Sequence, residues 1–252
     1  METPDPALHP RDGVRLARRT GRFGTIEIVE RPDGARLYVQ NQQIQSLARP
    51  GGVSLLPYVQ AMRALLVQTT ARRVAILGGA GGTLGTMLAA AGARPVLVDV
   101  NPEAFALAAQ YFWLAPAIER VVADAARYLS AGTELFDAIV LDAFDGGDMP
   151  AHLATAGFLA LVRRRLLPQG LLIANAPLMA PTGGGRQPRS RVPSLSASLA
   201  AAGFPVTVFE GPRQICRNAL VVGGPLPAID LPMGDEPAET RRELDSLRRH
   251  DR

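Results

Sequence analysis

The stretch RRVAILGGAGGTLGTMLAAAGARPVLVDVNP, residues 72–102, decides the fold class of this chain. It begins with a short apolar run, passes through a turn that holds four glycines, and reaches a second apolar run that ends at Asp99. Apolar runs without alternation are typical of parallel strands that are buried on both faces, and the segment between them is typical of a helix. The stretch therefore predicts a right-handed strand–helix–strand unit with a glycine-rich turn after its first strand.

The same alternation continues downstream to about residue 225. The apolar runs are RVAILGG, RPVLVDV, ERVVADA, FDAIVLDAF and GLLIANA, and helical segments separate them. Two further runs, FPVTVFEG and NALVVGG, follow one another closely enough to form a final antiparallel pair. The order predicts a Rossmann-like α/β domain at residues 71–225, with a doubly wound, mostly parallel sheet that the antiparallel pair closes.

Three other segments complete the predicted organisation. Residues 1–20 are charged and carry prolines, so we expect a flexible N-terminus. Residues 21–70 predict a small β-rich domain with a β-hairpin that turns at Pro32-Asp33-Gly34, followed by a linking helix. The edge of this hairpin is a candidate contact for a homodimer. Residues 226–252 predict a polar C-terminal tail or a peripheral helix.

Composition excludes several classes of function. All 27 basic residues are arginine and the net charge is +4, so Schiff-base lysine chemistry and a P-loop lysine are both excluded. The arginines are scattered, which argues against a nucleic-acid partner. The apolar runs are far shorter than the ~20 residues of a membrane span, and no secretory apolar core is present, so we expect a cytoplasmic protein without a membrane partner. Cys216 is the single cysteine, which we expect to be a small buried side chain.

The residues at three successive strand ends predict a ligand site. The glycine cluster lets the backbone approach a nucleoside closely, and it consists of Gly78, Gly79, Gly81 and Gly82. Asp99 ends the second strand, where a carboxylate can accept hydrogen bonds from ribose hydroxyls. Asp124 ends the third strand, from which it can reach an adenine amino group. A dinucleotide needs more room, so this pattern favours a mononucleoside, although each aspartate could merely cap a loop.

The motif order GGAGG, LVDVNP, VVADAARYL, FDAIVLDAFDGGDMPAHL and LLPQGLLIANA resembles the spermidine synthases, the polyamine aminopropyltransferases built on the class I S-adenosylmethionine-dependent methyltransferase fold. The resemblance covers residues 22–225 and implies S-adenosylmethionine or its decarboxylated form as the donor, a small amine or other nucleophile as the acceptor, and no metal. The donor contacts that it implies are Gln45, Gly78, Gly79, Gly81, Gly82, Asp99, Asp124, Ala125 and Asp142.

The resemblance also implies a catalytic loop, Asp142-Ala143-Phe144-Asp145, after the fourth strand. Asp142 is then the base that removes a proton from the acceptor amine, Asp145 is a second catalytic and substrate-binding acid, and Tyr58 contacts the substrate. The PAHL sequence at residues 150–153 matches the family's gating loop over the active site. His152 within it could be a second proton carrier, but a lone loop histidine is more often solvated.

Two departures from the family pattern concern the acceptor. Ala80 stands where the family's glycine turn has an aspartate, and Tyr58-Val59-Gln60 replaces a Tyr-(His or Gln)-Glu motif. Two carboxylates that hold a cationic polyamine are therefore missing. We expect poor turnover of putrescine and a smaller, less charged or more apolar acceptor that contacts Tyr58, Val59 and Phe144.

Three functional classes remain open at this point. The leading interpretation is aminopropyl transfer. Methyl transfer needs the same sulfonium geometry but fewer contributions from the protein, mainly proximity and orientation. A catalytically silent nucleoside-binding module would need only the donor site. The acceptor, the group transferred and the oligomeric state are not decided by the sequence. Residues 183–191, GGGRQPRSR, predict a mobile surface loop because they offer no large apolar side chain to bury.

Overall fold

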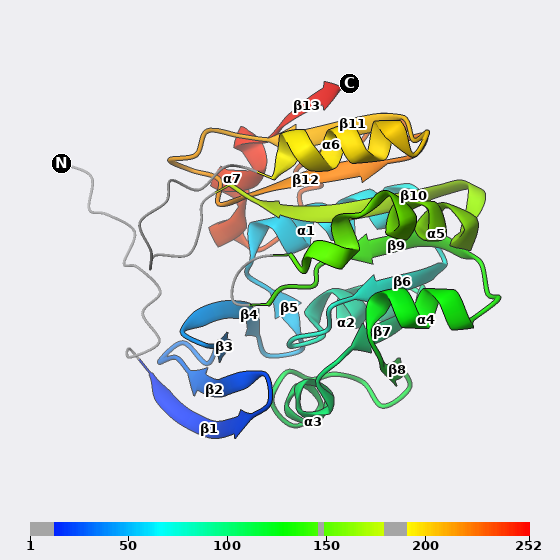
Figure 1. Ribbon diagram of the computed structural model, residues 1–252. Helices are drawn as coiled ribbons and strands as arrows, with labels where there is room; N and C mark the ends of the chain where they lie inside the picture. Colours follow the sequence, from blue (N-terminus) through cyan, green and yellow to red (C-terminus); the bar gives the residue numbers. More distant parts are fainter. Residues whose placement is uncertain (1–12, 146–148, 179–190) are drawn as a thin grey trace, which may run out of the picture.

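The computed structural model describes residues 13–145, 149–178 and 191–252 and contains two sheets (Figure 1). Most of the loop expected to be mobile at residues 183–191 therefore lies outside the described residues. A five-stranded sheet is formed by the N-terminal part of the chain, and an eight-stranded sheet by the rest. No helix in the described part of the chain is both long enough and apolar enough to cross a membrane.

The N-terminal sheet is antiparallel and follows the order of the chain. Its strands are β1 (Val14–Gly21), β2 (Gly24–Glu30), β3 (Arg36–Gln40), β4 (Gln43–Arg49) and β5 (Val53–Ser54). The predicted hairpin is present as β2 and β3. At its turn Asp33 accepts a hydrogen bond from the backbone NH of Ala35, and Gly34 adopts a positive φ of 79°. The turn residues thus supply the conformation and the hydrogen bond that the hairpin needs.

Strand β1 differs from the expectation that residues 1–20 are flexible. Residues 14–20 pair with β2, and of the first 20 residues only 1–12 lie outside the described part of the chain. The strand has little apolar alternation, but Arg15 and Arg18 both reach Glu27 on β2, and Ala17 is buried. Backbone pairing to an existing sheet and cross-strand ion pairs therefore hold a segment whose composition alone suggested disorder.

The large sheet has the order β13-β11-β12-β10-β9-β6-β7-β8. Its parallel strands are β6 (Arg73–Leu77), β7 (Arg94–Asp99), β8 (Glu119–Val122), β9 (Phe136–Leu141) and β10 (Leu166–Pro177). The antiparallel part consists of β11 (Val206–Glu210), β12 (Asn218–Gly223) and β13 (Arg248–Asp251). The chain enters the sheet at β6, winds to β8 and then returns to β9, so a topological switch point lies between β6 and β9, where ligands bind in such sheets.

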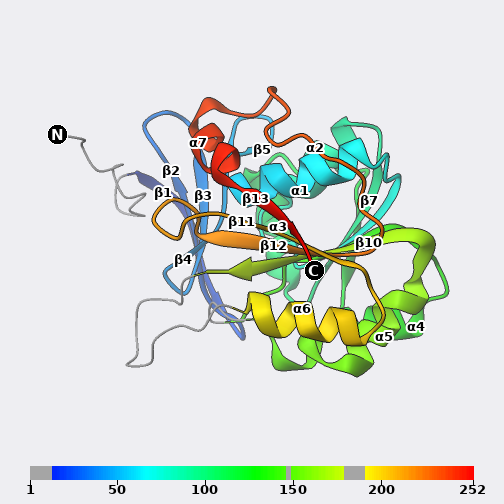
Figure 2. The ribbon, with the colours of Figure 1, turned by 90° about the horizontal axis from the view of Figure 1, so that it is seen from above.

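Helices cover both faces of this sheet, as Figure 2 shows. One face carries α1 (Pro57–Gln68), α2 (Thr83–Ala90), α3 (Pro102–Tyr111) and α7 (Ala238–Ser246), and the other carries α4 (Ala125–Ala131), α5 (Ala156–Arg165) and α6 (Val192–Ala201). Side chains of the strands alternate between these two apolar layers: Ile76 and Val140 belong to the first, Leu77 and Leu141 to the second. The predicted doubly wound α/β fold is confirmed.

The C-terminal segment combines the predicted peripheral helix with a strand that was not predicted. Helix α7 packs on the sheet through Leu244, which is fully buried. Strand β13 then pairs with β11 at the edge of the sheet, and the Thr207 hydroxyl donates to Asp251 at 2.6 Å. The sequence RRHD has no apolar signal, so this strand depends on main-chain pairing. Cys216 is buried as expected, beside Ser246.

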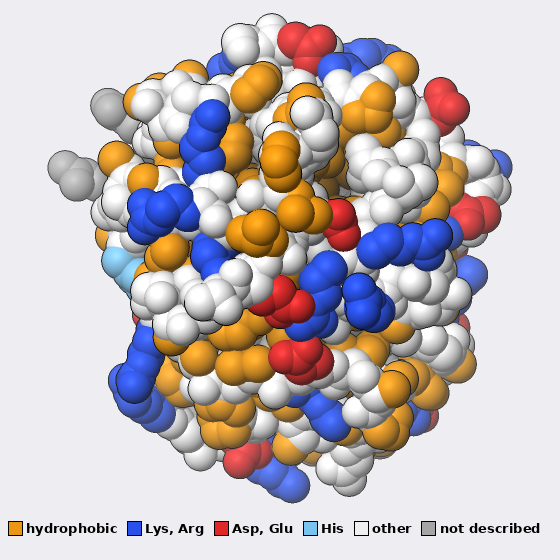
Figure 3. Space-filling model, turned by 90° about the vertical axis from the view of Figure 1, so that its right-hand side faces the viewer, with side chains coloured by type: hydrophobic (Ala, Val, Ile, Leu, Met, Phe, Trp, Pro, Cys, Tyr) orange, Lys and Arg blue, Asp and Glu red, His pale blue; other side chains and the backbone are white. Residues whose placement is uncertain are grey.

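The amino ends of the parallel strands carry ion pairs. Arg73, at the start of β6, donates to Glu119 and Glu134, both at 2.7 Å. Asp137 accepts hydrogen bonds from the backbone NH groups of residues 72 and 73. Figure 3 faces the side toward which these strand ends lie and shows acidic and basic side chains next to one another there. The carboxyl ends, on the opposite side, carry the candidate site.

Candidate active site

The glycine turn after β6 is shaped by contacts that exclude larger residues. Gly78 has a φ of 104°, and a Cβ atom on it would lie 2.2 Å from the backbone oxygen of Asp142. The backbone NH of Gly81 donates to the Ser46 hydroxyl of β4 at 3.0 Å. Gly82 is the N-cap of α2 and adopts the left-handed conformation. The turn is thus fitted between the end of β9 and the N-terminal sheet, which explains its glycines.

Asp99 at the end of β7 supports this turn directly. One carboxylate oxygen accepts from the backbone NH of Gly79 and the other from that of Asn101, both at 2.8 Å. Burial raises the pKa of Asp99, and the backbone hydrogen bonds act in the opposite direction. The side chain therefore fixes the shape of the glycine turn, a role that the sequence analysis did not foresee beside the predicted ribose contact.

Asp124 and Ala125 lie at the start of α4. Asp124 is the N-cap of this helix, accepting from the Arg127 NH at 3.0 Å, and its second oxygen lies 2.8 Å from Nε2 of the exposed His152. Burial acts to raise the pKa of Asp124, but the hydrogen bonds from Arg127 and His152 outweigh it and leave the pKa below its ordinary value. Ala125 is buried beneath this cap. Asp124 thus caps a helix, where the sequence alone suggested a loop cap as the alternative to adenine binding, and His152 has an acidic partner.

Asp142 follows β9 and lies in a network of polar side chains. The Asn175 amide of β10 donates to it at 2.7 Å, and the Tyr58 hydroxyl of α1 donates to it as well. Asn175 in turn accepts a hydrogen bond from the Asn218 amide of β12 at 2.8 Å. Burial raises the pKa of Asp142 to about 7, although both hydrogen bonds act to lower it. A carboxyl group with this pKa can hold or release a proton near neutral pH.

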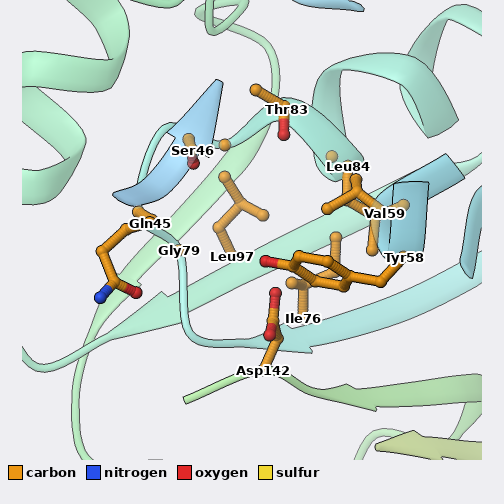
Figure 4. Close-up of a pocket in the computed structure, with 13 residues that line it drawn as sticks. Gln45, Ser46, Tyr58, Val59, Ile76, Gly79, Thr83, Leu84, Leu97 and Asp142 are labelled. Carbon is orange, nitrogen blue, oxygen red and sulfur yellow. The ribbon is translucent and has the colours of Figure 1, made fainter. Parts of the chain in front are cut away.

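Tyr58 comes from the first turn of α1, where Pro57 starts the helix. Figure 4 shows its hydroxyl pointing toward the carboxylate of Asp142. Burial, followed by the charge and the hydrogen bond of Asp142, raises the pKa of Tyr58 well above its ordinary value. The phenol therefore stays protonated and acts as a hydrogen-bond donor to Asp142.

A small cavity is lined by Tyr58, Asp142 and part of the glycine turn (Figure 4). It lies between the N-terminal sheet, α1 and the glycine turn, and the residues that line it are Gln45, Ser46, Tyr58, Val59, Ile76, Gly79, Ala80, Gly82, Thr83, Leu84, Gly85, Leu97 and Asp142. Five predicted site residues are therefore in its wall: Gln45, Tyr58, Gly79, Gly82 and Asp142. Of the described residues in this wall, Asp142 is the only carboxylate.

The other predicted site residues lie around the cavity rather than in its wall. Gly78, Gly81 and Asp99 form the turn and its support, and Asp124 and Ala125 form the adjoining helix cap. Asp145 is exposed to solvent, and Phe144 packs against the core layer that contains α4, α5 and α6. The catalytic loop thus contributes its first aspartate to the cavity, and neither Asp145 nor Phe144 is in the described wall.

The two departures from the family pattern differ in position. Ala80 lines the cavity and adopts a positive φ of 34°. Gln60 is 1% exposed and donates to the backbone oxygen of Ser54 at 2.6 Å, and its side-chain oxygen has no hydrogen-bond partner among the described residues. Ala80 therefore bears directly on what the cavity can bind, whereas Gln60 is a buried side chain behind it.

Sequence reasoning missed Asn175 and Asn218. Asn175 interrupts the apolar run LLIANA at the carboxyl end of a strand, which is a signal that could have been used. Asn218 gave no comparable signal, because its contact depends on the register of β10 with β12. Among the described residues, no group of three or more histidine, cysteine, aspartate or glutamate side chains is arranged to hold a metal ion.

The sheet order and its helical layers define the fold class, that of the class I methyltransferases and the spermidine synthases. A probable spermidine synthase from Corynebacterium glutamicum superposes with a TM-score of 0.73 over 93% of this chain and 90% of that one, at 20% identity. Human methyltransferase-like protein 13 in complex with SAH superposes with a TM-score of 0.51 over 75% of this chain and 91% of that one, at 19% identity.

In sequence the chain is similar to curated proteins named polyamine aminopropyltransferase, which confirms the resemblance predicted from the motifs. The protein of Vibrio vulnificus is 33% identical over 127 residues, which are 47% of this chain and 42% of the relative. That of Chromobacterium violaceum is 30% identical over 159 residues, 60% of each chain. The chain thus matches less than two thirds of the length of these two relatives. No family model matches it.

Proposed function

We propose that this protein is a spermidine synthase-like transferase that uses an S-adenosylmethionine-type donor and transfers an aminopropyl group to an amine. The observation that carries the proposal is the position of Asp142, which lines the cavity beside the glycine turn and is held by Tyr58 and Asn175. The donor nucleoside would lie on the glycine turn with its ribose near Asp99 and its adenine near Asp124 and Ala125. Gln45 would contact the donor from the N-terminal sheet.

The reaction needs a neutral amine that attacks the carbon next to the sulfonium of the donor. A new carbon–nitrogen bond forms, the carbon–sulfur bond breaks, and methylthioadenosine leaves with the electron pair of that bond. The amine reaches the site as an ammonium, so one proton must be removed. Asp142 would accept it, because a carboxyl group whose pKa is about 7 is a stronger base than an ordinary aspartate. Tyr58 and Asn175 would hold the carboxylate in place for this transfer.

We propose further that the preferred acceptor carries one positive charge rather than two. Putrescine brings two ammonium groups, and leaving one of them without a carboxylate in a partly desolvated cavity costs several kcal/mol. Asp142 is the only carboxylate in the described wall, Ala80 offers no charge, and Asp145 is exposed. The cavity wall can therefore balance about one charge, and Val59, Leu84 and Leu97 offer apolar surface to the rest of the acceptor.

A product assay tests both levels of the proposal. The purified protein is incubated with decarboxylated S-adenosylmethionine or S-adenosylmethionine, and with butylamine or putrescine, which have the same number of carbons but differ by one amine. We expect methylthioadenosine from the decarboxylated donor, with butylamine turned over at least as efficiently as putrescine, and no product from Asp142→Asn.

The other outcomes identify the alternatives. S-adenosylhomocysteine as the product would indicate a methyltransferase on this fold. Nucleoside binding by calorimetry without either product would indicate a silent binding module. Fast putrescine turnover, at about 1 per second or more, with slower butylamine turnover would leave the aminopropyl transfer intact and overturn the preference for a singly charged acceptor.

A further inference from the structure

Two asparagines connect Asp142 to the antiparallel part of the sheet. Nδ2 of Asn175 donates to Oδ1 of Asp142 at 2.7 Å, and Nδ2 of Asn218 donates to Oδ1 of Asn175 at 2.8 Å. Asn175 is 2% exposed, so water cannot readily replace either partner. Asn218 does not line the cavity, and it belongs to β12, where it is paired in register with Pro177.

The orientation of the Asn175 amide determines whether it donates to Asp142 or presents an oxygen to it. An ionised carboxylate only accepts hydrogen bonds, whereas an asparagine presents a donor on one side and an acceptor on the other. If the Asn175 amide turned over, its oxygen would face Asp142 and repel the ionised form. The hydrogen bond from Asn218 opposes that rotation, because it requires the oxygen of Asn175 to face β12.

We propose that Asn218 is a positioning residue that holds the Asn175 amide with its NH₂ group toward Asp142. The inference about the amide rests on the geometry alone, and its importance for turnover rests on the proposed role of Asp142 as the base. Asn218 acts from the second strand away from the cavity and would touch neither donor nor acceptor. The antiparallel strand β12 would in this way control whether the carboxyl group is presented as an acceptor or as a protonated donor.

Two substitutions separate amide orientation from charge. Asn218→Leu is close in size and removes the donor without adding a charge. Asn218→Asp places an acceptor where the donor was, so the Asn175 amide is expected to turn its NH₂ group toward β12 and its oxygen toward Asp142. Because the turned amide favours the protonated carboxyl group, both substitutions should raise the pKa of Asp142, Asn218→Asp more than Asn218→Leu. The expected rise for Asn218→Leu is about one pH unit, because the freed Asn175 amide can turn and accept a hydrogen bond from the protonated carboxyl group.

The matched control is Thr207→Val on the neighbouring strand β11. Thr207 is 5% exposed and donates to Asp251 at the edge of the same sheet, so its replacement removes one side-chain hydrogen bond from the antiparallel strands without touching Asp142. It is expected to lower stability to a comparable extent and to leave the Asp142 titration unchanged. Thermal unfolding of each variant establishes that it is folded before it is titrated.

The test is an NMR titration of isotopically labelled aspartate carboxyl groups in the full chain, in which the signal absent from Asp142→Asn identifies Asp142. A higher midpoint in both Asn218 variants, with wild-type behaviour in Thr207→Val, supports the proposal. Wild-type midpoints in both, or a rise only in the charged Asn218→Asp, overturn it. The titration needs no substrate, so it tests the role of Asn218 independently of turnover. Absence of turnover would contradict the proposed function but would not change the outcome of the titration. Where turnover occurs, kcat should fall at low pH in both Asn218 variants while KM changes little.

Discussion

The backbone oxygen of Asp142 lies 2.2 Å from the position that a Cβ atom on Gly78 would take. The two residues directly follow the adjacent parallel strands β6 and β9. The Asp142 NH donates to the oxygen of Leu77, the residue before Gly78, at 2.8 Å. The candidate base and the glycine turn are therefore set at a fixed separation by main-chain contacts. This close approach is possible only because residue 78 has no side chain.

Gly78→Ala should distort this junction. The added methyl group would overlap the Asp142 carbonyl, and φ at 104° is unfavourable for alanine, so the free energy of unfolding is expected to fall by about 2 kcal/mol or more. Donor binding should fall with it. Gly157→Ala is the control, because a Cβ there meets nothing within 4 Å in helix α5 and should be neutral or stabilising by up to about 1 kcal/mol. Equal denaturation midpoints for the two variants would contradict the steric argument.

Asp99→Ala should weaken donor binding and loosen the glycine turn together. The ribose hydroxyls would lose their acceptor, at an expected cost of about 1 to 3 kcal/mol in binding free energy. The backbone NH groups of Gly79 and Asn101 would lose theirs as well. Asp99→Asn keeps one acceptor oxygen and should show a smaller loss of stability. Calorimetry with the nucleoside measures the first effect, and unchanged binding in Asp99→Ala would remove this residue from the donor site.

Ala80→Asp should improve the use of putrescine. The new carboxylate would lie in the cavity wall and balance a second ammonium group, and aspartate is one of the residues that tolerates the positive φ of 34° at this position. Ala80→Asn is the matched control, with the same shape and no charge. We expect kcat/KM for putrescine relative to butylamine to rise about tenfold or more in Ala80→Asp, the equivalent of ~1.4 kcal/mol. No difference between the two variants would argue against charge as the cause of acceptor preference.

The pKa of Asp142 predicts a pH-dependent effect on stability. A carboxyl group whose pKa is raised on folding binds more protons in the folded state, so it stabilises the protein below its unfolded pKa, and this stabilisation is lost as the pH rises through about 7. Asp142→Asn should therefore raise the unfolding midpoint relative to wild type at about pH 8, with the difference shrinking as the pH falls toward about 4. Thermal unfolding across this range gives the answer, and a difference independent of pH would contradict the raised pKa.

Much of the fold was predictable because buried parallel strands leave a strong local signal. The apolar runs at β6, β7, β9 and β10, the glycine turn and the hairpin turn at Asp33 and Gly34 all encode their conformation within a few residues. Strands β1 and β13 do not: their arginine-rich sequences form strands because a neighbouring strand supplies main-chain partners. Such pairing is a property of the assembled sheet, which a local pattern cannot reveal.

The candidate site divides in the same way. The position of Asp142 followed from its place at a strand end, and the structure places it in the cavity wall. The exposure of Asp145 did not follow from its spacing within the loop, because the motif fixes sequence distance but not the direction of the side chain. The contact between Asn175 and Asn218 joins residues 43 positions apart and depends on strand register. Local signals thus located the carboxylate in the cavity wall, and long-range packing determined its partners.

The hydrogen bond from Gly81 to Ser46 connects the glycine turn of one sheet to a strand of the other. Gln45 and Ser46 also supply the part of the cavity wall that the large sheet lacks. The cavity is therefore complete only when the smaller sheet is docked against the glycine turn. A compact intermediate with native helices and a detached N-terminal sheet would lack this part of the wall and could not hold a ligand there.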